Sequence, residues 1–305
     1  MPILVVGSVA FDALETPFGR VDRCIGGSAT YFSVAASFFT PVDLVAVVGD
    51  DFTEEDASIF RGRNINTDGL QRVPGEKTFF WSGEYGYDLN VAKTRDTQLN
   101  VFANFKPELS EAQRNCDVLF LANIQPELQL DVLRQTKRPR LVALDTMNLW
   151  INIKRDELER VFREVDLIVI NEAEVRMFTK EPNLIKGARS ILALGPQTLV
   201  IKRGEYGVIM VTKDAIFAAP AYPLENVFDP TGAGDTFAGG FLGYLASRSE
   251  IHDRELRRAI IFGSVLASFT VEKFSLDRLR EISLNEIHER YQDFRALTHF
   301  EDFDR

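Results

Sequence analysis

Residues 229–237 of this 305-residue chain read Asp-Pro-Thr-Gly-Ala-Gly-Asp-Thr-Phe, and the other motifs are best interpreted from this stretch. Pro230 cannot continue a helix, while Gly232 and Gly234 permit a tight turn with unusual backbone angles. Asp235 stands where a helix N-cap is expected, ahead of a run with apolar residues at helical spacing. The sequence therefore predicts a glycine turn that leads into a buried helix.

This turn has the composition of an anion site. Small residues ahead of a helix leave backbone N–H groups that point outward, and such a turn suits a phosphate. A carboxylate beside this turn repels phosphate, so it is unfavourable unless it takes part in the reaction. Asp235 fits if it takes a proton from a hydroxyl group that attacks the phosphate. For a lone Gly-x-Gly-Asp, the simpler interpretation as a helix cap would be preferred.

The stretch resembles the second signature of the ribokinase (PfkB) family of sugar and nucleoside kinases, and the match is unbroken over residues 229–237. The resemblance implies an ATP- and Mg²⁺-dependent enzyme that moves the γ-phosphate to a hydroxymethyl group of a sugar, with a nucleoside as the alternative acceptor. It implies that Asp235 is the general base and that Gly232, Ala233 and Gly234 present N–H groups to the transferred phosphoryl group. An inactive relative that only binds sugar or nucleotide is a third hypothesis.

Further matches concern the acceptor. A pair of glycines precedes a helical pattern, and Gly-Gly lets a ligand approach the backbone closely. This segment is similar to the family's first signature, so the resemblance assigns Gly26, Gly27 and Ser28 to the sugar site. Tyr31 departs from the pattern, because several members have an Asn there that bonds a sugar hydroxyl. Asp12 follows the first strand, where the family has a carboxylate that grips two hydroxyl groups.

The nucleotide side is assigned by two other motifs. Asn171 and Glu174 match the family's N-x-x-E motif, which holds phosphate and Mg²⁺ through water. Residues 202–207 resemble the nucleotide-binding turn T-x-G-x-x-G. This match assigns Lys202, Gly204 and Gly207 to the nucleotide. Lys202 replaces the usual Thr, and either Lys202 or Arg203 is expected to meet a phosphate, with a solvent-facing position as the alternative.

Weaker assignments rest on matching positions. Asp229 and Thr231 match residues that bind a monovalent cation in some members, so K⁺ is a further cofactor hypothesis. Gly263 is assigned to the adenine pocket by position alone. Together with the motifs above, these assignments cover most of the chain.

Short apolar runs recur at 3–7, 42–48, 118–122, 141–144, 167–170 and 198–201, as expected for strands covered on both faces. Helical patterns lie between them, beginning at Thr53 and extending over 127–135, 156–162 and 184–194. Another helical pattern follows Asn285. Strands that alternate with helices predict an α/β fold with a mostly parallel central sheet sandwiched by helices. We expect a single ribokinase-like domain over residues 1–305.

One region breaks this pattern. From residue 78 to 90, apolar and polar residues alternate, with aromatic side chains at Phe79, Trp81, Tyr85 and Tyr87. The period of two predicts a strand with one apolar face, and Val101, Ala103 and Phe105 repeat it more weakly. Segments 10–24 and 78–105 are therefore expected to form a small antiparallel β lid over the substrate. A homodimer through the lid is compatible with this, and packing on the core is the alternative.

Composition excludes several classes of protein. Lys plus Arg is 35 and Asp plus Glu is 45, and the net charge of −10 argues against nucleic acid as a partner. No segment resembles a transmembrane span or a signal peptide, and the two cysteines, Cys24 and Cys116, form no C-x-x-C motif. We therefore expect a cytoplasmic protein. The chain lacks G-x-G-x-x-G after its first strand, any Gly-Lys pair and H-E-x-x-H, which argues against dehydrogenases, P-loop enzymes and zinc hydrolases.

Overall fold

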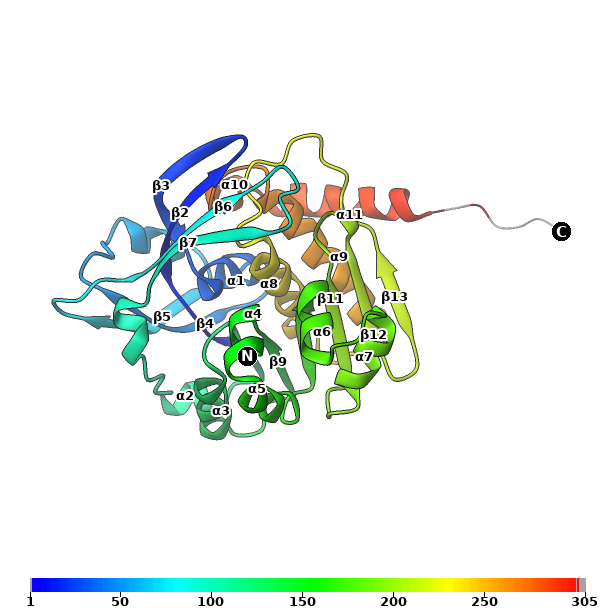
Figure 1. Cartoon of the computed structure of the whole chain (residues 1–305), viewed down its shortest axis with the longest axis horizontal. Coiled ribbons are helices and arrows are strands. Elements are labelled where there is room, and N and C mark those ends of the chain that lie inside the picture. The colour runs from blue at the N-terminus through cyan, green and yellow to red at the C-terminus, as the bar shows by residue number, and fades with distance from the viewer. Residues whose placement is uncertain (1, 300, 302–305) are drawn as a thin grey trace.

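The computed structural model describes residues 2–299 and 301, and a nine-stranded sheet forms the centre of this part of the chain (Figure 1). The strand order is β13-β12-β11-β10-β9-β8-β1-β4-β5. The strands are β1 (Ile3–Val6), β4 (Val42–Gly49), β5 (Ile65–Val73), β8 (Val118–Leu121), β9 (Leu141–Asp145), β10 (Leu167–Asn171), β11 (Thr198–Lys202), β12 (Val208–Thr212) and β13 (Ile216–Ala219). Neighbours from β5 to β11 pair in parallel, whereas β12 and β13 are antiparallel, so the predicted mostly parallel sheet is confirmed.

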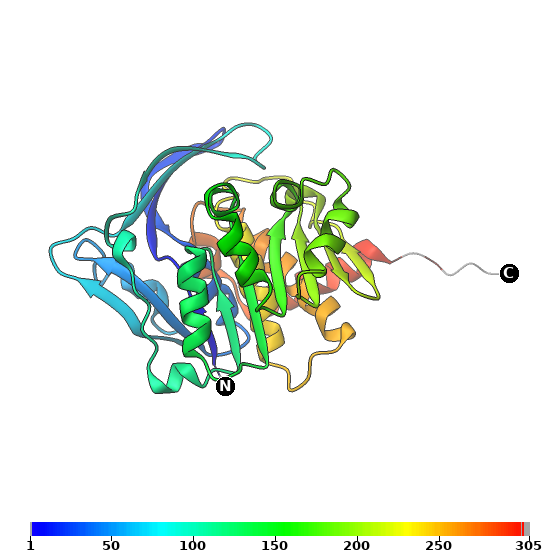
Figure 2. The ribbon, with the colours of Figure 1, turned by 60° about the horizontal axis from the view of Figure 1, so that its bottom comes forward.

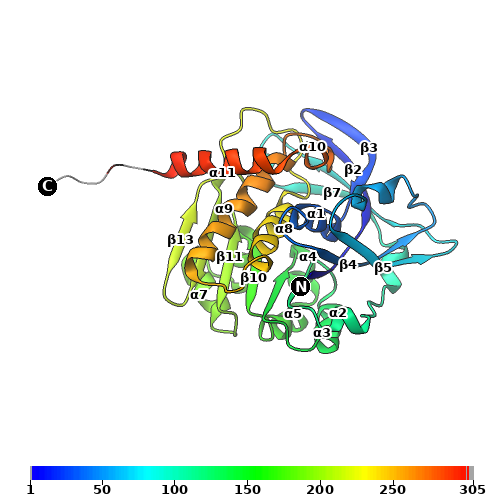
Figure 3. The same cartoon turned by 180° about the vertical axis from the view of Figure 1, so that it is seen from behind.

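Alternate residues of the strands build two cores on opposite faces of the sheet. Ile3 and Val5 belong to the first core, and Leu4 and Val6 belong to the second. Figure 3 shows the helices of the first face, which are α1 (Ser28–Ala36), α8 (Ala233–Ala246), α9 (Asp253–Thr270), α10 (Asp277–Glu281) and α11 (Leu284–Thr298). The second face is covered by α3 (Pro126–Gln135), α4 (Asn148–Ile153), α5 (Arg155–Phe162), α6 (Glu172–Thr179) and α7 (Leu184–Leu192). The short helix α2 (Glu111–Arg114) precedes β8.

Most predicted elements are found, with small shifts of their ends. The exception is the helix predicted to begin at Thr53. Only a short 3-10 helix, η1 (Asp56–Phe60), forms there. Strands β5, β12 and β13 were not predicted. Strands β5 and β13 lie at the sheet edges, where fewer apolar residues are needed, whereas β12 (Val-Ile-Met-Val-Thr) is an apolar run that the prediction missed. No helix in the described ranges is both long enough and apolar enough to cross a bilayer.

A second sheet stands apart from the first, with the order β3-β2-β6-β7. Its strands are β2 (Ala10–Thr16), β3 (Gly19–Gly26), β6 (Phe79–Tyr85) and β7 (Ala92–Gln98). Strands β2 and β6 pair in parallel and the others are antiparallel, so the flap is mixed rather than antiparallel as expected. In Figure 2 this sheet curves over one end of the α/β body. We refer to it as the lid sheet.

The expectation that Val101, Ala103 and Phe105 continue the lid as a strand is wrong. These residues lie in and after a 3-10 helix, η2 (Asn100–Asn104), which begins at a residue with φ of 47°. Val101, Phe102 and Phe105 are buried in the second core. The apolar side chains at 101, 102 and 105 thus follow a helical turn, and their packing under β4 overrides the weak alternation.

Helices α1 and α8 pack without intervening side chains. A Cβ atom on Gly239 would lie 2.4 Å from the carbonyl oxygen of Phe32, and one on Gly243 would lie 2.7 Å from Cα of Ala36. Because the contacts advance along both helices in the same direction, α1 and α8 run parallel and their N-termini lie at the same edge of the sheet. The two glycines therefore bring together the two glycine motifs that precede these helices.

We predict that Gly239→Ala destabilises the protein by about 1–3 kcal/mol, because overpacking against backbone outweighs the better helix propensity of Ala. Chemical denaturation would measure the loss. Gly86→Ala is the control, since a Cβ there meets no atom within 4 Å, and it should leave stability unchanged. Equal stability of the Gly239→Ala variant and the wild type would contradict the close helix contact.

Candidate active site

The glycine turn of residues 229–237 differs from its prediction at the helix start. Helix α8 begins at Ala233 and its N-cap is Gly232, so the expectation that Asp235 is the N-cap is wrong. Gly232 adopts the left-handed conformation (φ 74°), and its carbonyl accepts from the N–H of Thr236 at 2.8 Å. A Cβ on Gly232 would lie 2.4 Å from three ring atoms of Tyr31. Both the backbone angle and the aromatic ring therefore require glycine here.

The turn leaves two backbone donors available. The N–H of Ala233 donates to the carbonyl of Pro230 at 3.2 Å, so it is engaged in the turn itself. Within the described part of the chain, the N–H groups of Gly232 and Gly234 have no acceptor. Gly232 and Gly234, rather than all three residues of the turn, are thus the donors best placed for an anion.

Asp229 holds this turn to the protein. Its side chain is fully buried, and its two carboxylate oxygens accept from the backbone N–H groups of Thr231 (2.9 Å) and Ser275 (3.0 Å). The N–H of Phe228 donates to the carbonyl of Val271 at 2.8 Å. Burial raises the pKa of Asp229. These contacts make Asp229 a structural tie between the glycine turn and the loop that follows α9.

The predicted acceptor residues meet at the junction of the lid sheet and the body. A Cβ on Gly26 would lie 1.9 Å from Oδ2 of Asp12, so only glycine leaves room for that carboxylate. Gly27 has φ of 97° and packs against the carbonyl of Ser8. Ser28 is engaged elsewhere, because its N–H and hydroxyl contact the hydroxyl of Ser8 at 3.0 and 3.1 Å. Ser28 thus supports the glycine pair in this structure and its hydroxyl points to Ser8.

Asp12 is buried without compensation. Asp12 is 4% exposed, and no donor to its carboxylate is found among residues 2–299. Burial, together with the negative charges of Asp229 and Asp235, raises its pKa to about 8. An ionised carboxylate in this position gains from any ligand that brings hydroxyl donors to it.

A buried ion pair lies beside the glycine turn. Nζ of Lys202 lies 2.6 Å from Oδ2 of Asp145, and the two side chains are 18% and 4% exposed. A Cβ on Gly234 would lie 3.0 Å from the same Nζ atom. Lys202 therefore reaches the turn from the end of β11. Sequence analysis missed Asp145, although its place at the carboxyl end of the apolar strand β9 was a usable signal.

Two further carboxylates, those of Asp235 and Glu174, face this pair. Burial and the charge of Asp145 raise the pKa of Asp235 to about 7, and Lys202 partly offsets this. The same causes raise the pKa of Glu174 to about 7. Burial alone would lower the pKa of Lys202, but the carboxylates of Asp145, Asp235 and Glu174 raise it. Lys202 is thus held protonated in a pocket with an excess of negative charge.

Asn171 and Glu174 lie together at the start of α6, as a capping box. The N–H of Glu174 donates to Oδ1 of Asn171 at 2.8 Å, and the N–H of Asn171 donates to Oε2 of Glu174 at 3.0 Å. Each side chain is thus fixed by the other's backbone. Glu174 is buried and its remaining oxygen, Oε1, receives no hydrogen bond from the described residues.

The nucleotide turn lies at the end of β11, in the 3-10 helix η3 (Gly204–Tyr206). Gly204 (φ 56°) and Gly207 (φ 85°) both need positive φ angles. Arg203 is paired with Glu172 at 2.5 Å, so of the two cations here Lys202 is the one that faces the glycine turn. Gly263 lies in α9, where a Cβ would lie 2.8 Å from the carbonyl oxygen of Phe237, so the close packing of α8 and α9 requires a glycine here.

Besides Asp12 and Gly26, which lie in its own strands, the lid contributes hydrogen bonds near the glycine turn and the nucleotide turn. The hydroxyl of Thr231 donates to the hydroxyl of Tyr85 at 3.2 Å, and Asn90 in the β6–β7 loop donates to Glu205 at 3.0 Å. Trp81 is in register with Asp12, so both point to the inner face of the lid sheet. Of the predicted aromatic face, Trp81 and Tyr85 turn inward, whereas Tyr87 is 91% exposed in the loop.

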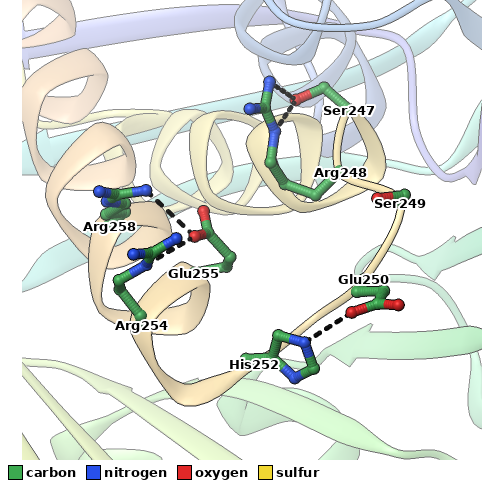
Figure 4. A pocket seen from close by; sticks show the side chains of 8 residues that line it. All are labelled: Ser247, Arg248, Ser249, Glu250, His252, Arg254, Glu255 and Arg258. Carbon is green, nitrogen blue, oxygen red and sulfur yellow. Dashed lines mark hydrogen bonds and ion pairs between the residues drawn. The ribbon is translucent and has the colours of Figure 1, made fainter.

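A separate hollow of about 500 Å³ lies at the turn between α8 and α9 (Figure 4). Arg254 and Arg258 pair with Glu255, and His252 pairs with Glu250. Arg248 donates instead to the hydroxyl of Ser247, so the carboxylates of the hollow are paired with its other basic side chains. The hollow contains none of the residues that the motifs select, so the candidate site remains at the glycine turn.

The family is decided by comparison with known proteins. A family model described as pfkB family carbohydrate kinase matches residues 3–281. This chain belongs to the pfkB family of carbohydrate kinases. The pfkB kinase is similar to a cytidine kinase of Thermococcus kodakarensis, with 32% identity over 256 residues that cover 81% of this chain and 90% of that protein.

Solved structures agree on the fold. The pfkB kinase superimposes on the nucleoside kinase of Methanocaldococcus jannaschii with a TM-score of 0.78 and 20% identity, covering 96% and 99% of the two chains. An E. coli protein assigned as ribokinase II, in complex with ATP and Mg²⁺, gives a TM-score of 0.78 with 17% identity and the same coverage. The predicted family, ribokinase-like fold and kinase activity are thus confirmed. The site residues, the cytoplasmic location and the dimer stay predictions.

The raised pKa of Asp12 predicts how stability depends on pH. Between its ordinary pKa of 3.8 and its raised pKa of about 8, the folded protein keeps a proton that the unfolded chain has released. This difference in bound protons lowers stability as the pH rises through that range. Asp12→Asn should therefore have a higher Tm than the wild type near pH 8, and this excess should shrink near pH 5. Thermal unfolding followed by circular dichroism measures both, with Asp131→Asn as the exposed control; a pH-independent excess would contradict the assignment.

Proposed function

We propose that the acceptor of this pfkB kinase is a nucleoside, whose hydroxymethyl group receives the γ-phosphate of ATP. The observation that carries this proposal is the inner face of the lid sheet, where Trp81 stands in register with Asp12, whose carboxylate has no donor among the described residues. A nucleoside can contact both residues, because its vicinal hydroxyls can donate to Asp12 and its flat base can stack on the ring of Trp81. A free sugar, the first hypothesis from sequence, would use Asp12 alone.

The relatives support this choice of acceptor. The cytidine kinase at 32% identity and the nucleoside kinase with the similar fold are both described as acting on nucleosides. A deoxyribokinase of Salmonella typhi is 25% identical over 297 residues, so a sugar acceptor is the competing outcome of the same assay.

Asp235 is the proposed general base. It lies in the first turn of α8, directly after the N–H groups that face the anion. Its pKa of about 7 suits a group that must accept a proton near neutral pH. Lys202 adds a positive charge beside Gly234, where negative charge would collect on the transferred group. Asp145 positions Lys202 by holding its Nζ atom.

The residues fit Mg²⁺ with ATP. Glu174 offers a carboxylate oxygen with no donor among the described residues, and Asp145 and Asp235 add negative charge around one lysine. No three such side chains of the described residues converge as direct metal ligands, so these groups suit a hydrated cation that they hold through water. Bound there, Mg²⁺ with ATP supplies the transferable phosphoryl group and neutralises part of its charge. Asn171 and Glu174 would hold this group, and Gly204 and Gly207 would form the adjoining turn.

The K⁺ hypothesis finds less support. Both carboxylate oxygens of Asp229 already accept backbone N–H groups, and the hydroxyl of Thr231 donates to Tyr85. These side chains do not fit a cation site in this arrangement, and we derive no step from K⁺.

Asp235→Asn should lower kcat by about 10²–10⁴-fold, because it removes positioned proton transfer. The fold should persist, since the amide has the same shape and burial disfavours the charged carboxylate. Steady-state kinetics with a coupled ADP assay measures kcat, and Asp214→Asn, an exposed site, is the control. A near-normal kcat in Asp235→Asn would remove it from the role of base.

A panel of cytidine, adenosine, inosine, ribose and deoxyribose tests the acceptor class. We expect kcat/KM for at least one nucleoside to exceed that for ribose by about tenfold or more, since base stacking contributes about 1–3 kcal/mol. Trp81→Ala should remove most of this preference while the activity on ribose changes little. Tyr87→Ala, at an exposed lid position, should preserve the preference. A wild type that prefers free sugars would overturn the nucleoside proposal and leave the kinase assignment intact.

A further inference from the structure

The indole of Trp81 occupies a space that is open only because residue 83 is glycine. A Cβ atom on Gly83, two residues further along β6, would lie 2.1 Å from Cη2, 2.5 Å from Cζ2 and 2.8 Å from Cζ3 of the indole. The backbone does not itself require glycine, because Gly83 is not among the residues with a positive φ angle. The position of the indole therefore explains the missing side chain at residue 83.

A hydrogen bond from the neighbouring strand holds the same ring. Nε1 of Trp81 donates to Oγ1 of Thr94 in β7 at 3.2 Å. Since Nε1, Cζ2 and Cη2 lie along one edge of an indole, the bond to Thr94 and the contact with Gly83 hold the same edge. The N–H group is the only polar group of a tryptophan side chain, and here it is used within the lid sheet.

A β-bulge brings Thr94 to this place. The register between β6 and β7 shifts by one residue at Arg95, so Thr94 rather than Arg95 stands opposite Gly83. Arg95 lies on the outer face of the lid sheet, where it pairs with Glu15 at 2.6 Å and with Glu84 at 2.9 Å. The bulge thus turns a hydroxyl group toward the indole and the positive charge away from it.

The indole lies on the face of β6 that meets the body. Tyr85, four residues further along and on the same face, accepts a hydrogen bond from Thr231 in the glycine turn at 3.2 Å. Phe79, two residues before Trp81, stacks on Phe102 of the body with ring centroids 5.3 Å apart. Trp81 itself is half-buried, between two aromatic side chains that already have partners. Its ring is therefore the one on this strand that is placed for a ligand under the lid.

We propose that Gly83 and Thr94 position the indole of Trp81 as the surface on which the base of a nucleoside stacks. This inference rests on the proposed function. Because Thr94 engages the N–H group, the ring offers a ligand its π face and no hydrogen-bond donor. Every base has a π face, so Trp81 contributes equally to the binding of purine and pyrimidine nucleosides. Gly83 and Thr94 are positioning residues, since they act through Trp81.

Gly83→Ala tests the contact, because its methyl group displaces the indole without a backbone penalty. We expect the ratio of kcat/KM for a nucleoside to kcat/KM for ribose to fall by about fivefold or more, through a higher KM for the nucleoside. The KM for ATP should stay the same. Gly86→Ala is the control, since a Cβ atom there meets nothing within 4 Å, and it should preserve the ratio.

A double-mutant cycle separates this role from a general effect on the lid. In a Trp81→Ala background there is no indole to displace, so adding Gly83→Ala should not change the ratio further. Equal losses in the two backgrounds would overturn the proposal, and so would a wild-type ratio in Gly83→Ala alone. If Gly83→Ala fails to fold, the double variant should restore folding, and its failure to do so overturns the proposal as well.

Thr94→Val removes the hydroxyl and keeps the shape of the side chain. It should lower the same ratio by about twofold to fivefold, because one hydrogen bond no longer fixes the ring. Thr94→Ser keeps the hydroxyl and should restore the ratio. The loss should be equal for cytidine and adenosine. A wild-type ratio in Thr94→Val, or a loss confined to one of the two nucleosides, contradicts the proposed role of Thr94.

Near-ultraviolet circular dichroism tests the position of the indole without an acceptor. Trp150 gives a constant background, because it is buried and its Nε1 atom donates to Asn123 at 2.9 Å. Gly83→Ala should weaken the signal as Trp81→Ala does, and an unchanged signal overturns the inference whatever the acceptor is. The proposed function fails separately, because a wild-type enzyme that prefers free sugars shows its failure before any variant is made.

Discussion

The contact between helices α1 and α8 is the constraint on which the site depends. Gly239 and Gly243 let the two backbones approach, and the parallel direction of the helices puts both N-termini at one edge of the sheet. One N-terminus carries the glycine pair beside Asp12, and the other carries the turn at Gly232. The acceptor and phosphate halves of the site are therefore positioned by a packing contact that involves neither ligand.

The buried charges of the site destabilise the free protein but suit catalysis. Asp12, Asp235 and Glu174 are held where burial and neighbouring carboxylates raise their pKa values to about 8, 7 and 7. Lys202 compensates only part of this negative charge, since its partner Asp145 is itself a carboxylate. Such an excess is unfavourable in a free protein and favourable for one that binds a cation and transfers a proton. The free protein is thus less stable because of this excess negative charge, which bound ligands compensate.

The lid sheet is buried against the body along β2 and exposed along β7. Among its hydrogen bonds to the body, Ser275 donates to the carbonyl of Ile25 in β3, Arg23 in β3 donates to the carbonyl of Asp51, and Thr231 donates to Tyr85 in β6. Its outer face carries exposed charges, with Arg95 between Glu15 and Glu84, and the strand β7 is exposed throughout. Elements with few buried contacts are the ones that open most easily, and those that cover an active site need to do so.

The sequence by itself determined the features that contiguous residues encode. The alternation of strands and helices, the turn around Gly232 and the glycine pair at Gly26 are all local patterns, and the family match over residues 3–281 agrees with them. Local patterns were least accurate where backbone conformation shifts a boundary, as at Asp235, or where core packing overrides a weak alternation, as at Val101.

Only the tertiary structure decided which side chains meet. Lys202 and Asp145 are 57 residues apart and pair because β9, β10 and β11 lie side by side, an order that no local pattern contains. The hydroxyl of Ser28 contacts that of Ser8, 20 residues away in sequence, for the same reason. A hydrogen bond depends on distances across the fold, whereas a turn or a strand depends on neighbours in the chain.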